Sequence, residues 1–321
     1  MAGVSPDPLA PLVGLPGVAD AVRRAREAVV ALHRHPVNRT GWAASAAEAA
    51  LRAARASAAL DGAELERPDG VVTDPVLAGA VRAAEATGRL LGTWRTAPLQ
   101  ALARLHVLAA ADLGAADGAP RLGASDAADA HGVSAVSGAA DAHGTSSVSG
   151  AADAAAVSGA QGTAAVSGAQ GTAAVSGAQG TAAVSGVARA ADSAGAPGRP
   201  VRGTERLALL AELVTGGTAV PAPVLVAVVH GELLTLEPFG SANGVVARAA
   251  ARLAAISSGL DPRGLAVPEV GHLRAATAYR EAARGFAAGT PGGLAAWIRH
   301  CCDQWVAGAR EGRSIADART K

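Results

Sequence analysis

Residues 237–248, Glu-Pro-Phe-Gly-Ser-Ala-Asn-Gly-Val-Val-Ala-Arg, join a loop of small residues to a helical pattern. Backbone N–H groups in a loop of Gly, Ser and Ala approach an anion closely, and the free amides and dipole of the following helix favour negative charge. Arg248 stands one turn into that helix, where its guanidinium adds a full positive charge. The segment therefore predicts an anion site.

The same segment resembles the motif of the Fic (Fido) domain proteins, His-Pro-Phe-x-(Asp/Glu)-Gly-Asn-Gly-Arg-x-x-Arg. The positions that match are Pro238, Phe239, Asn243, Gly244 and Arg248. The positions that depart from it are Glu237 for the histidine, Ser241 for the acid, Ala242 for the first glycine and Val245 for the first arginine. Weaker similarities to the family lie at His230 and in the segments 279–281, 289–291 and 297–298, so the resemblance covers residues 42–113 and 203–310.

A second motif lies far upstream, where Ser57-Ala-Ala-Leu-Asp61-Gly62 is similar to the family's inhibitory-helix signature, Ser/Thr-x-x-x-Glu-(Gly/Asn). This similarity implies that the carboxylate of Asp61 reaches Arg248 and competes with a nucleotide phosphate. The alternative is a solvent-exposed aspartate before a glycine that ends a helix. We assign Ser57, Asp61 and Gly62 a regulatory role on this resemblance.

The resemblance implies a protein adenylyltransferase, in which the motif histidine deprotonates a target hydroxyl that attacks a nucleotide phosphate. Glu237 stands in that place, either as a general base with a raised pKa or as a residue that is merely tolerated or caps local amides. Ser241 offers only a neutral hydroxyl where the family binds Mg²⁺, so Mg²⁺ binding is expected to be weak. Val245 removes a bidentate phosphate contact. If the chain is an enzyme, we expect an impaired nucleotidyltransferase.

What remains of the motif favours nucleotide binding over turnover. We expect ATP at a loop formed by Ser241, Asn243, Gly244 and Arg248, with a protein as the target of any transfer. For Arg248 a structural ion pair is the alternative to phosphate binding. The alternative function is a pseudoenzyme that acts as a regulatory or interaction scaffold. An oxidoreductase is a remote third hypothesis, since no dinucleotide fingerprint is present.

Composition excludes several classes of partner. The net charge is +1 and no basic run is interleaved with aromatic residues, so we expect no nucleic-acid binding. The longest apolar run, residues 219–229, contains Pro221 and Pro223 and is shorter than the ~20 residues that span a bilayer. The N-terminus lacks the pattern of a secretory signal, and the adjacent Cys301 and Cys302 form no disulfide framework. These features predict a cytoplasmic protein without a membrane partner.

Helical periodicity dominates outside the repeats, so the predicted fold class is all-α, as a Fic-like helical bundle with a long low-complexity insertion. The predicted helices are 17–34, 43–60, one that begins at Pro75 after the N-cap Asp74, 98–113, 204–214, 222–236, 244–257, 273–286 and 291–310. On the helix from Pro75, the residues placed on one face are Leu77, Val81, Ala84, Gly88 and Leu91.

The predicted organisation has five parts: an N-terminal helical segment 1–41, a first part of the Fic-like domain 42–113, a disordered repeat insertion 114–202, a Fic-like core 203–312 and a tail 313–321. Within the insertion, residues 127–150 form a twelve-residue repeat and residues 151–186 form nine-residue units that end in Val-Ser-Gly. One valine per unit leaves no face to bury, so disorder is expected, with a repetitive β-helix as the alternative.

No metal site is predicted, because no spacing groups the histidines as ligands. His33 and His35 lie at a predicted helix end, which suits a contact with the helix dipole. His106, His272 and His300 fall on separate predicted helices, and His230 is interpreted as a packed helix residue.

Overall fold

The computed structural model describes residues 7–65, 74–113 and 203–320. Of these residues 79% are helical and none forms a strand, which confirms the all-α fold class. The predicted insertion 114–202 and its repeats lie outside the described residues. No helix in the described ranges combines the length and hydrophobicity that crossing a bilayer requires.

The chain forms two series of helices on either side of the undescribed residues 114–202. The first series is α1 (Ala10–Val13), α2 (Val18–His33), α3 (Pro36–Thr40), α4 (Trp42–Leu60), α5 (Pro75–Thr96) and α6 (Pro98–Ala110). The second is α8 (Gly203–Glu212), the π-helix η1 (Leu213–Gly217), α9 (Ala222–Leu236), α10 (Asn243–Ser257), α11 (Pro268–Arg274), α12 (Ala276–Ala287) and α13 (Pro291–Ala318).

Local capping chemistry explains several of these boundaries. Asp74 accepts a hydrogen bond from the backbone N–H of Leu77 at 3.0 Å and precedes a proline at the first position of α5. Thr290 caps α13 in the same way, with a hydrogen bond of 3.1 Å from the N–H of Gly293. At the C-terminal end of α4, Gly62 adopts φ 90°, a left-handed conformation that favours glycine.

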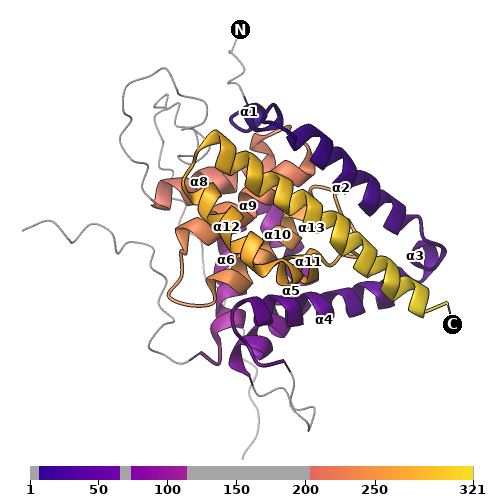
Figure 1. Ribbon diagram of the computed structural model, residues 1–321. Helices are drawn as coiled ribbons and strands as arrows, with labels where there is room; N and C mark the ends of the chain where they lie inside the picture. The colour runs from indigo at the N-terminus through magenta and orange to yellow at the C-terminus, as the bar shows by residue number, and fades with distance from the viewer. Residues whose placement is uncertain (1–6, 66–73, 114–202, 321) are drawn as a thin grey trace, which may run out of the picture. The chain divides into compact units, whose positions relative to one another are not determined.

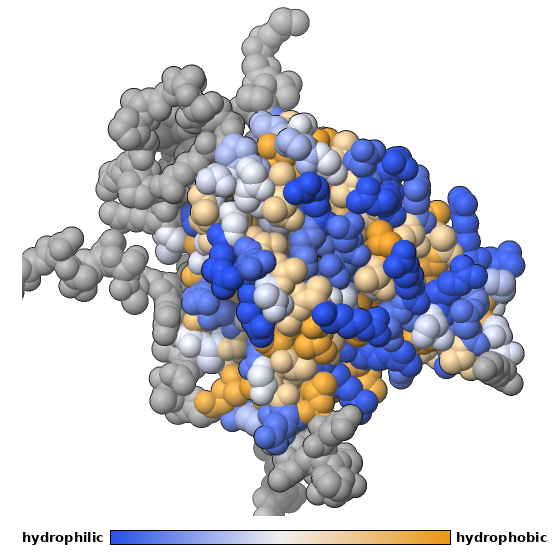
Figure 2. Space-filling view, in the orientation of Figure 1, coloured by the Kyte–Doolittle hydropathy of each residue, from blue (hydrophilic) through white to orange (hydrophobic). Residues whose placement is uncertain are grey.

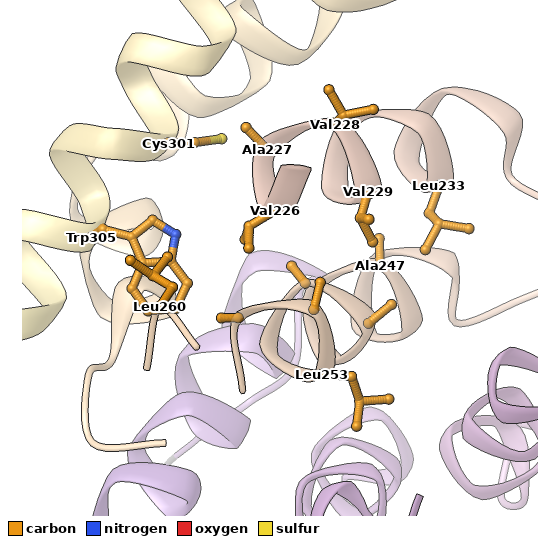
Figure 3. Packing of buried hydrophobic residues seen from close by; sticks show 14 of the residues in the cluster. Val226, Ala227, Val228, Val229, Leu233, Ala247, Leu253, Leu260, Cys301 and Trp305 are labelled. Carbon is orange, nitrogen blue, oxygen red and sulfur yellow. The ribbon is translucent and has the colours of Figure 1, made fainter. Parts of the chain in front are cut away.

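All described residues belong to one compact unit in which the two series pack together. α13 lies beside α2, and α10 packs on α4, α5 and α6 from the first series as well as on α9 (Figure 1). The N-terminal helices therefore share a core with the rest of the chain. α9 is apolar around most of its circumference because it is covered on several sides, and Figure 3 shows Val226 and Val229 directed toward α10 and Val228 directed to the opposite side.

Glycines allow some of these helices to approach closely. A Cβ on Gly293 of α13 would coincide with the backbone carbonyl of Gly285 on α12, and a Cβ on Gly308 would lie 2.5 Å from the backbone nitrogen of Pro268. Small side chains bury little area each, so close packing of this kind is what stabilises a core with few aromatic residues.

The structure differs from the predicted elements in several respects. On α5, Leu77, Ala80, Ala83, Leu90 and Trp94 are buried. Of the predicted face, Leu77 is buried, Val81, Ala84 and Leu91 are partly buried against the core, and only Gly88 is exposed. The helix predicted from residue 204 already includes Gly203, and it passes into the π-helix η1 near its end. A separate helix, α11, precedes the predicted helix 273–286, and α13 continues to Ala318 through residues assigned to the tail.

The visible surface carries hydrophilic residues spread across it, with apolar residues between them (Figure 2). The strongly exposed apolar side chains of the described residues include Val107, Val30 and Leu99. Scattered apolar residues of this kind are normal for a protein surface.

Candidate anion-binding site

The loop between α9 and α10 is held in shape by two residues with left-handed backbone conformation. Glu237 ends α9 with φ 41° and Ala242 precedes α10 with φ 56°. Such conformations are unusual for residues with a Cβ and mark a loop whose geometry is imposed by its surroundings. The chain at 237–248 is therefore a loop followed by a helix, as the sequence indicates.

Asn243 closes this loop rather than facing a ligand. Its side-chain amide donates to the carbonyl of Phe239 at 2.8 Å, and its Oδ1 accepts from the N–H of the same residue at 3.0 Å. Phe239 is buried and its ring stacks on His106 of α6, with centroids 4.3 Å apart and planes 6° apart. Asn243 and Phe239 thus form the frame that fixes where α10 begins.

The N-terminus of α10 has no side-chain cap, because the residue at that position is Ala242. The first N–H groups of a helix have no partner within the helix, and the helix dipole places partial positive charge there. Ser241 lies just before, and its hydroxyl oxygen is buried with no hydrogen-bond partner among the described residues. The loop therefore presents hydrogen-bonding groups that are not used elsewhere.

A carboxylate from the other series of helices lies against the first turn of α10. Both oxygens of Asp61, the C-cap residue of α4, lie 2.5 Å from the point where a Cβ on residue 244 would stand. Only glycine at position 244 leaves room for the carboxylate. The same group forms an ion pair with Arg248, with 2.8 Å between Oδ1 and Nη2.

Arg248 is almost completely buried, at 3% exposure, and all its contacts come from other helices. Its Nε donates to the hydroxyl of Ser57 at 2.7 Å and its Nη2 donates to the carbonyl of the same residue at 2.9 Å. Nη1 donates to the hydroxyl of Tyr279 at 3.4 Å. Burial acts to lower the pKa of Arg248, but the interactions with Tyr279 and Asp61 outweigh it and the pKa is raised, so the guanidinium is charged.

The remaining predicted site residues are placed apart from this ion pair. Glu237 is exposed at the end of α9. Val245 is 3% exposed and belongs to the apolar core, where it lines a cavity of about 20 Å³ with Ser57 and Arg248. The structure thus brings together Ser57, Asp61, Gly244 and Arg248. It leaves Glu237 at the surface and gives Asn243 a role within the loop.

Tyr279 and a group of histidines beside it were not grouped by the sequence. His230 accepts or donates a hydrogen bond with the hydroxyl of Tyr279 at 2.9 Å, and Nδ1 of His272 lies 3.2 Å from Nε2 of His300. Burial lowers the pKa of His230 and that of His272 well below the usual value, and it raises the pKa of Tyr279 to about 12. The signals for Tyr279 were the weak similarity of residues 279–281 to the family and its spacing of seven residues from Phe286, the other aromatic residue of α12.

These histidines do not complete a metal site. Among residues 7–65, 74–113 and 203–320, no group of three or more His, Cys, Asp or Glu side chains is arranged to hold a metal ion. A cavity of about 20 Å³, room for about one water molecule, separates part of the cluster from Glu269 and Trp305. The cluster is therefore a buried neutral network behind Arg248.

Comparison of the sequence with models of known protein families and with curated proteins finds no match. The fold and the site define an all-α protein with a buried arginine that binds an internal carboxylate at an uncapped helix N-terminus.

Proposed function

We propose that this chain is a Fic-like nucleotide-binding protein whose phosphate site is closed by its own Asp61. The observation that carries the proposal is the position of that carboxylate, which contacts Arg248 and lies over Gly244 at the start of α10. The carboxylate pairs with the guanidinium beside the first turn of α10. A phosphate has the same charge sign and the same kind of acceptor oxygens, so it competes for the same groups.

The contact between Asp61 and Arg248 is the one that the similarity to the inhibitory-helix signature implies. Asp61 is 27% exposed at its side chain, whereas Arg248 is 3% exposed. The aspartate is therefore the partner that can move out while the arginine stays in place. Release of Asp61 would leave a buried charge without a carboxylate partner, which favours a replacement anion.

Transfer chemistry is proposed to be impaired. Glu237 stands at the surface in place of the motif histidine, and Val245 is packed in the core where the family has an arginine. At the position where the family binds Mg²⁺ this chain has the neutral hydroxyl of Ser241, and the nearby carboxylate of Asp61 is paired with Arg248. These donors do not fit a resident Mg²⁺ ion, which prefers carboxylate and phosphate oxygens.

The alternative is a pseudoenzyme scaffold, in which the ion pair of Asp61 and Arg248 serves only to join α4 to α10. The burial of Val245 favours this alternative, because the neighbouring phosphate contact of the family has been replaced by core packing. Under this alternative the ion pair is structural and the site takes no ligand.

Calorimetric titration of ATP into the full chain, with and without Mg²⁺, separates the two functions. Asp61→Ala and Asp61→Asn should bind ATP about tenfold or more tighter than the unaltered chain, because a charge-assisted contact no longer has to be broken before binding. Asp20→Ala is the matched control, since Asp20 is exposed and pairs with Arg23 on the same helix face. No heat and no rise in melting temperature for either Asp61 variant would leave the scaffold function.

A further inference from the structure

Arg280 lies at the mouth of the proposed phosphate site. It is exposed on α12, and its Nη2 donates to the carbonyl of Leu60 at 3.5 Å. Leu60 is the last residue of α4 and directly precedes Asp61 in the chain. The residue before Arg280 is Tyr279, whose hydroxyl contacts Arg248 from the inner side. α12 thus contacts both Arg248 and the C-terminal end of α4.

We propose that Arg280 is a second phosphate-binding residue, and that the site therefore takes a linear polyphosphate of two or more phosphoryl groups. This inference rests on the proposed function. Arg248 holds one phosphoryl group inside the site, and Arg280 holds the next one at its mouth. Position 245 carries no charge and is buried, so the second positive charge comes from another helix.

The present contact of Arg280 is weak enough to be exchanged for a ligand. A donor–acceptor distance of 3.5 Å is at the outer limit of a hydrogen bond, and the side chain is exposed. Consecutive Cα atoms are about 3.8 Å apart, so a guanidinium that reaches Leu60 is within one residue of the carboxylate of Asp61. When that carboxylate leaves Arg248, Arg280 is placed beside the vacated position.

A cation beside the last carbonyls of a helix also complements the helix dipole, so a purely structural role must be separated from ligand binding. If the role of Arg280 is structural, its removal lowers the free energy of unfolding and does not alter the preference for longer phosphates. If Arg280 binds the ligand, its removal abolishes that preference and leaves the affinity for orthophosphate nearly unchanged.

The test uses the full chain carrying Asp61→Asn, alone and combined with Arg280→Ala or Arg284→Ala. Orthophosphate, pyrophosphate, tripolyphosphate and ATP are titrated into each protein by calorimetry. Arg284 is the matched control because it is exposed on the same helix, one turn further along. Urea unfolding of each protein measures any structural contribution.

We expect Asp61→Asn to bind pyrophosphate and tripolyphosphate about tenfold tighter than orthophosphate, since one further charge-assisted contact is gained. Arg280→Ala should abolish this difference, and Arg284→Ala should preserve it. The inference is overturned if the preference for longer phosphates survives Arg280→Ala or if both arginine variants reduce it equally. It is also overturned if Asp61→Asn binds ATP but binds orthophosphate, pyrophosphate and tripolyphosphate equally well. Absence of ATP binding to Asp61→Asn overturns the proposed function itself.

Discussion

The carboxylate of Asp61 stands 2.5 Å from the point where a Cβ on Gly244 would be, so the two residues are sterically complementary. They are far apart in sequence and meet because α4 ends against the start of α10. A glycine at the N-terminus of a helix and an aspartate at the C-terminus of another thus share one small volume. Several measurements follow from this and from related contacts.

Gly244→Ala should destabilise the chain by about 1–3 kcal/mol, because the added methyl group overlaps the carboxylate of Asp61. In a chain that already carries Asp61→Ala the same substitution should be neutral or stabilising, since alanine is the better helix former. Urea unfolding of the four proteins gives the coupling between the two sites, expected at about 1–2 kcal/mol. Additive effects would show that the two residues do not share this space in solution.

Gly293→Ala should cost about 3 kcal/mol, because its methyl group would meet the carbonyl of Gly285 where α12 and α13 cross. Gly292→Ala is the control at the adjacent position, where nothing lies within 4 Å of an added Cβ. That change should stabilise the chain by about 0.5–1 kcal/mol. Thermal or urea unfolding measures both, and equal effects would contradict the close approach of the helices.

Val245→Arg, which restores the arginine of the family motif, should destabilise the chain by about 3–5 kcal/mol, because it places an unpaired charge in the core. Glu237→His should change stability by no more than about 0.5 kcal/mol, since the residue is exposed and histidine tolerates left-handed backbone conformation. The denaturant midpoints of the Val245→Arg and Glu237→His proteins, compared with that of the unaltered chain, measure these changes in stability. A stable Val245→Arg protein would mean that this side chain can reach solvent or an anion.

Stability should fall as the pH drops below about 6.5, the pKa of histidine in an unfolded chain. Burial first, and then neighbouring positive charge, lowers the pKa of His230 and of His272 in the folded state, so the unfolded state binds more protons. Each such proton contributes a slope of about 1.4 kcal/mol per pH unit. The groups that surround the pair and share its environment are Arg248, Arg252, Glu269, Tyr279, His300 and Cys301.

The measurement for this pH dependence is the free energy of unfolding by urea at pH 7.5, 6.5 and 5.5. His272→Asn should reduce the slope of the unfolding free energy against pH by about 1.4 kcal/mol per pH unit, which corresponds to one proton. The other buried histidines still titrate, so part of the slope remains. A constant stability between pH 7.5 and 5.5 would contradict the burial of neutral histidines.

Much of the local structure could be predicted because it depends on neighbours in sequence. Asp74 with Pro75 and Thr290 with Pro291 mark helix starts, and the structure places α5 and α13 there. α9 has the predicted bounds, and α10 begins one residue earlier than predicted. The loop between them was expected from its small residues, and the ion pair of Asp61 with Arg248 was expected from a resemblance alone.

By itself the sequence determined the fold class and most helix boundaries, and it placed a loop between α9 and α10, since capping, turn and propensity effects act within a few residues. Only the tertiary structure decided that Asn243 closes the loop, that Val245 is buried, and that Tyr279 joins Ser57 around Arg248. It also decided which face of α5 is buried. Alanine-rich helices have weak apolar stripes, so the face that packs is chosen by neighbouring helices, and contacts between distant residues follow from that choice.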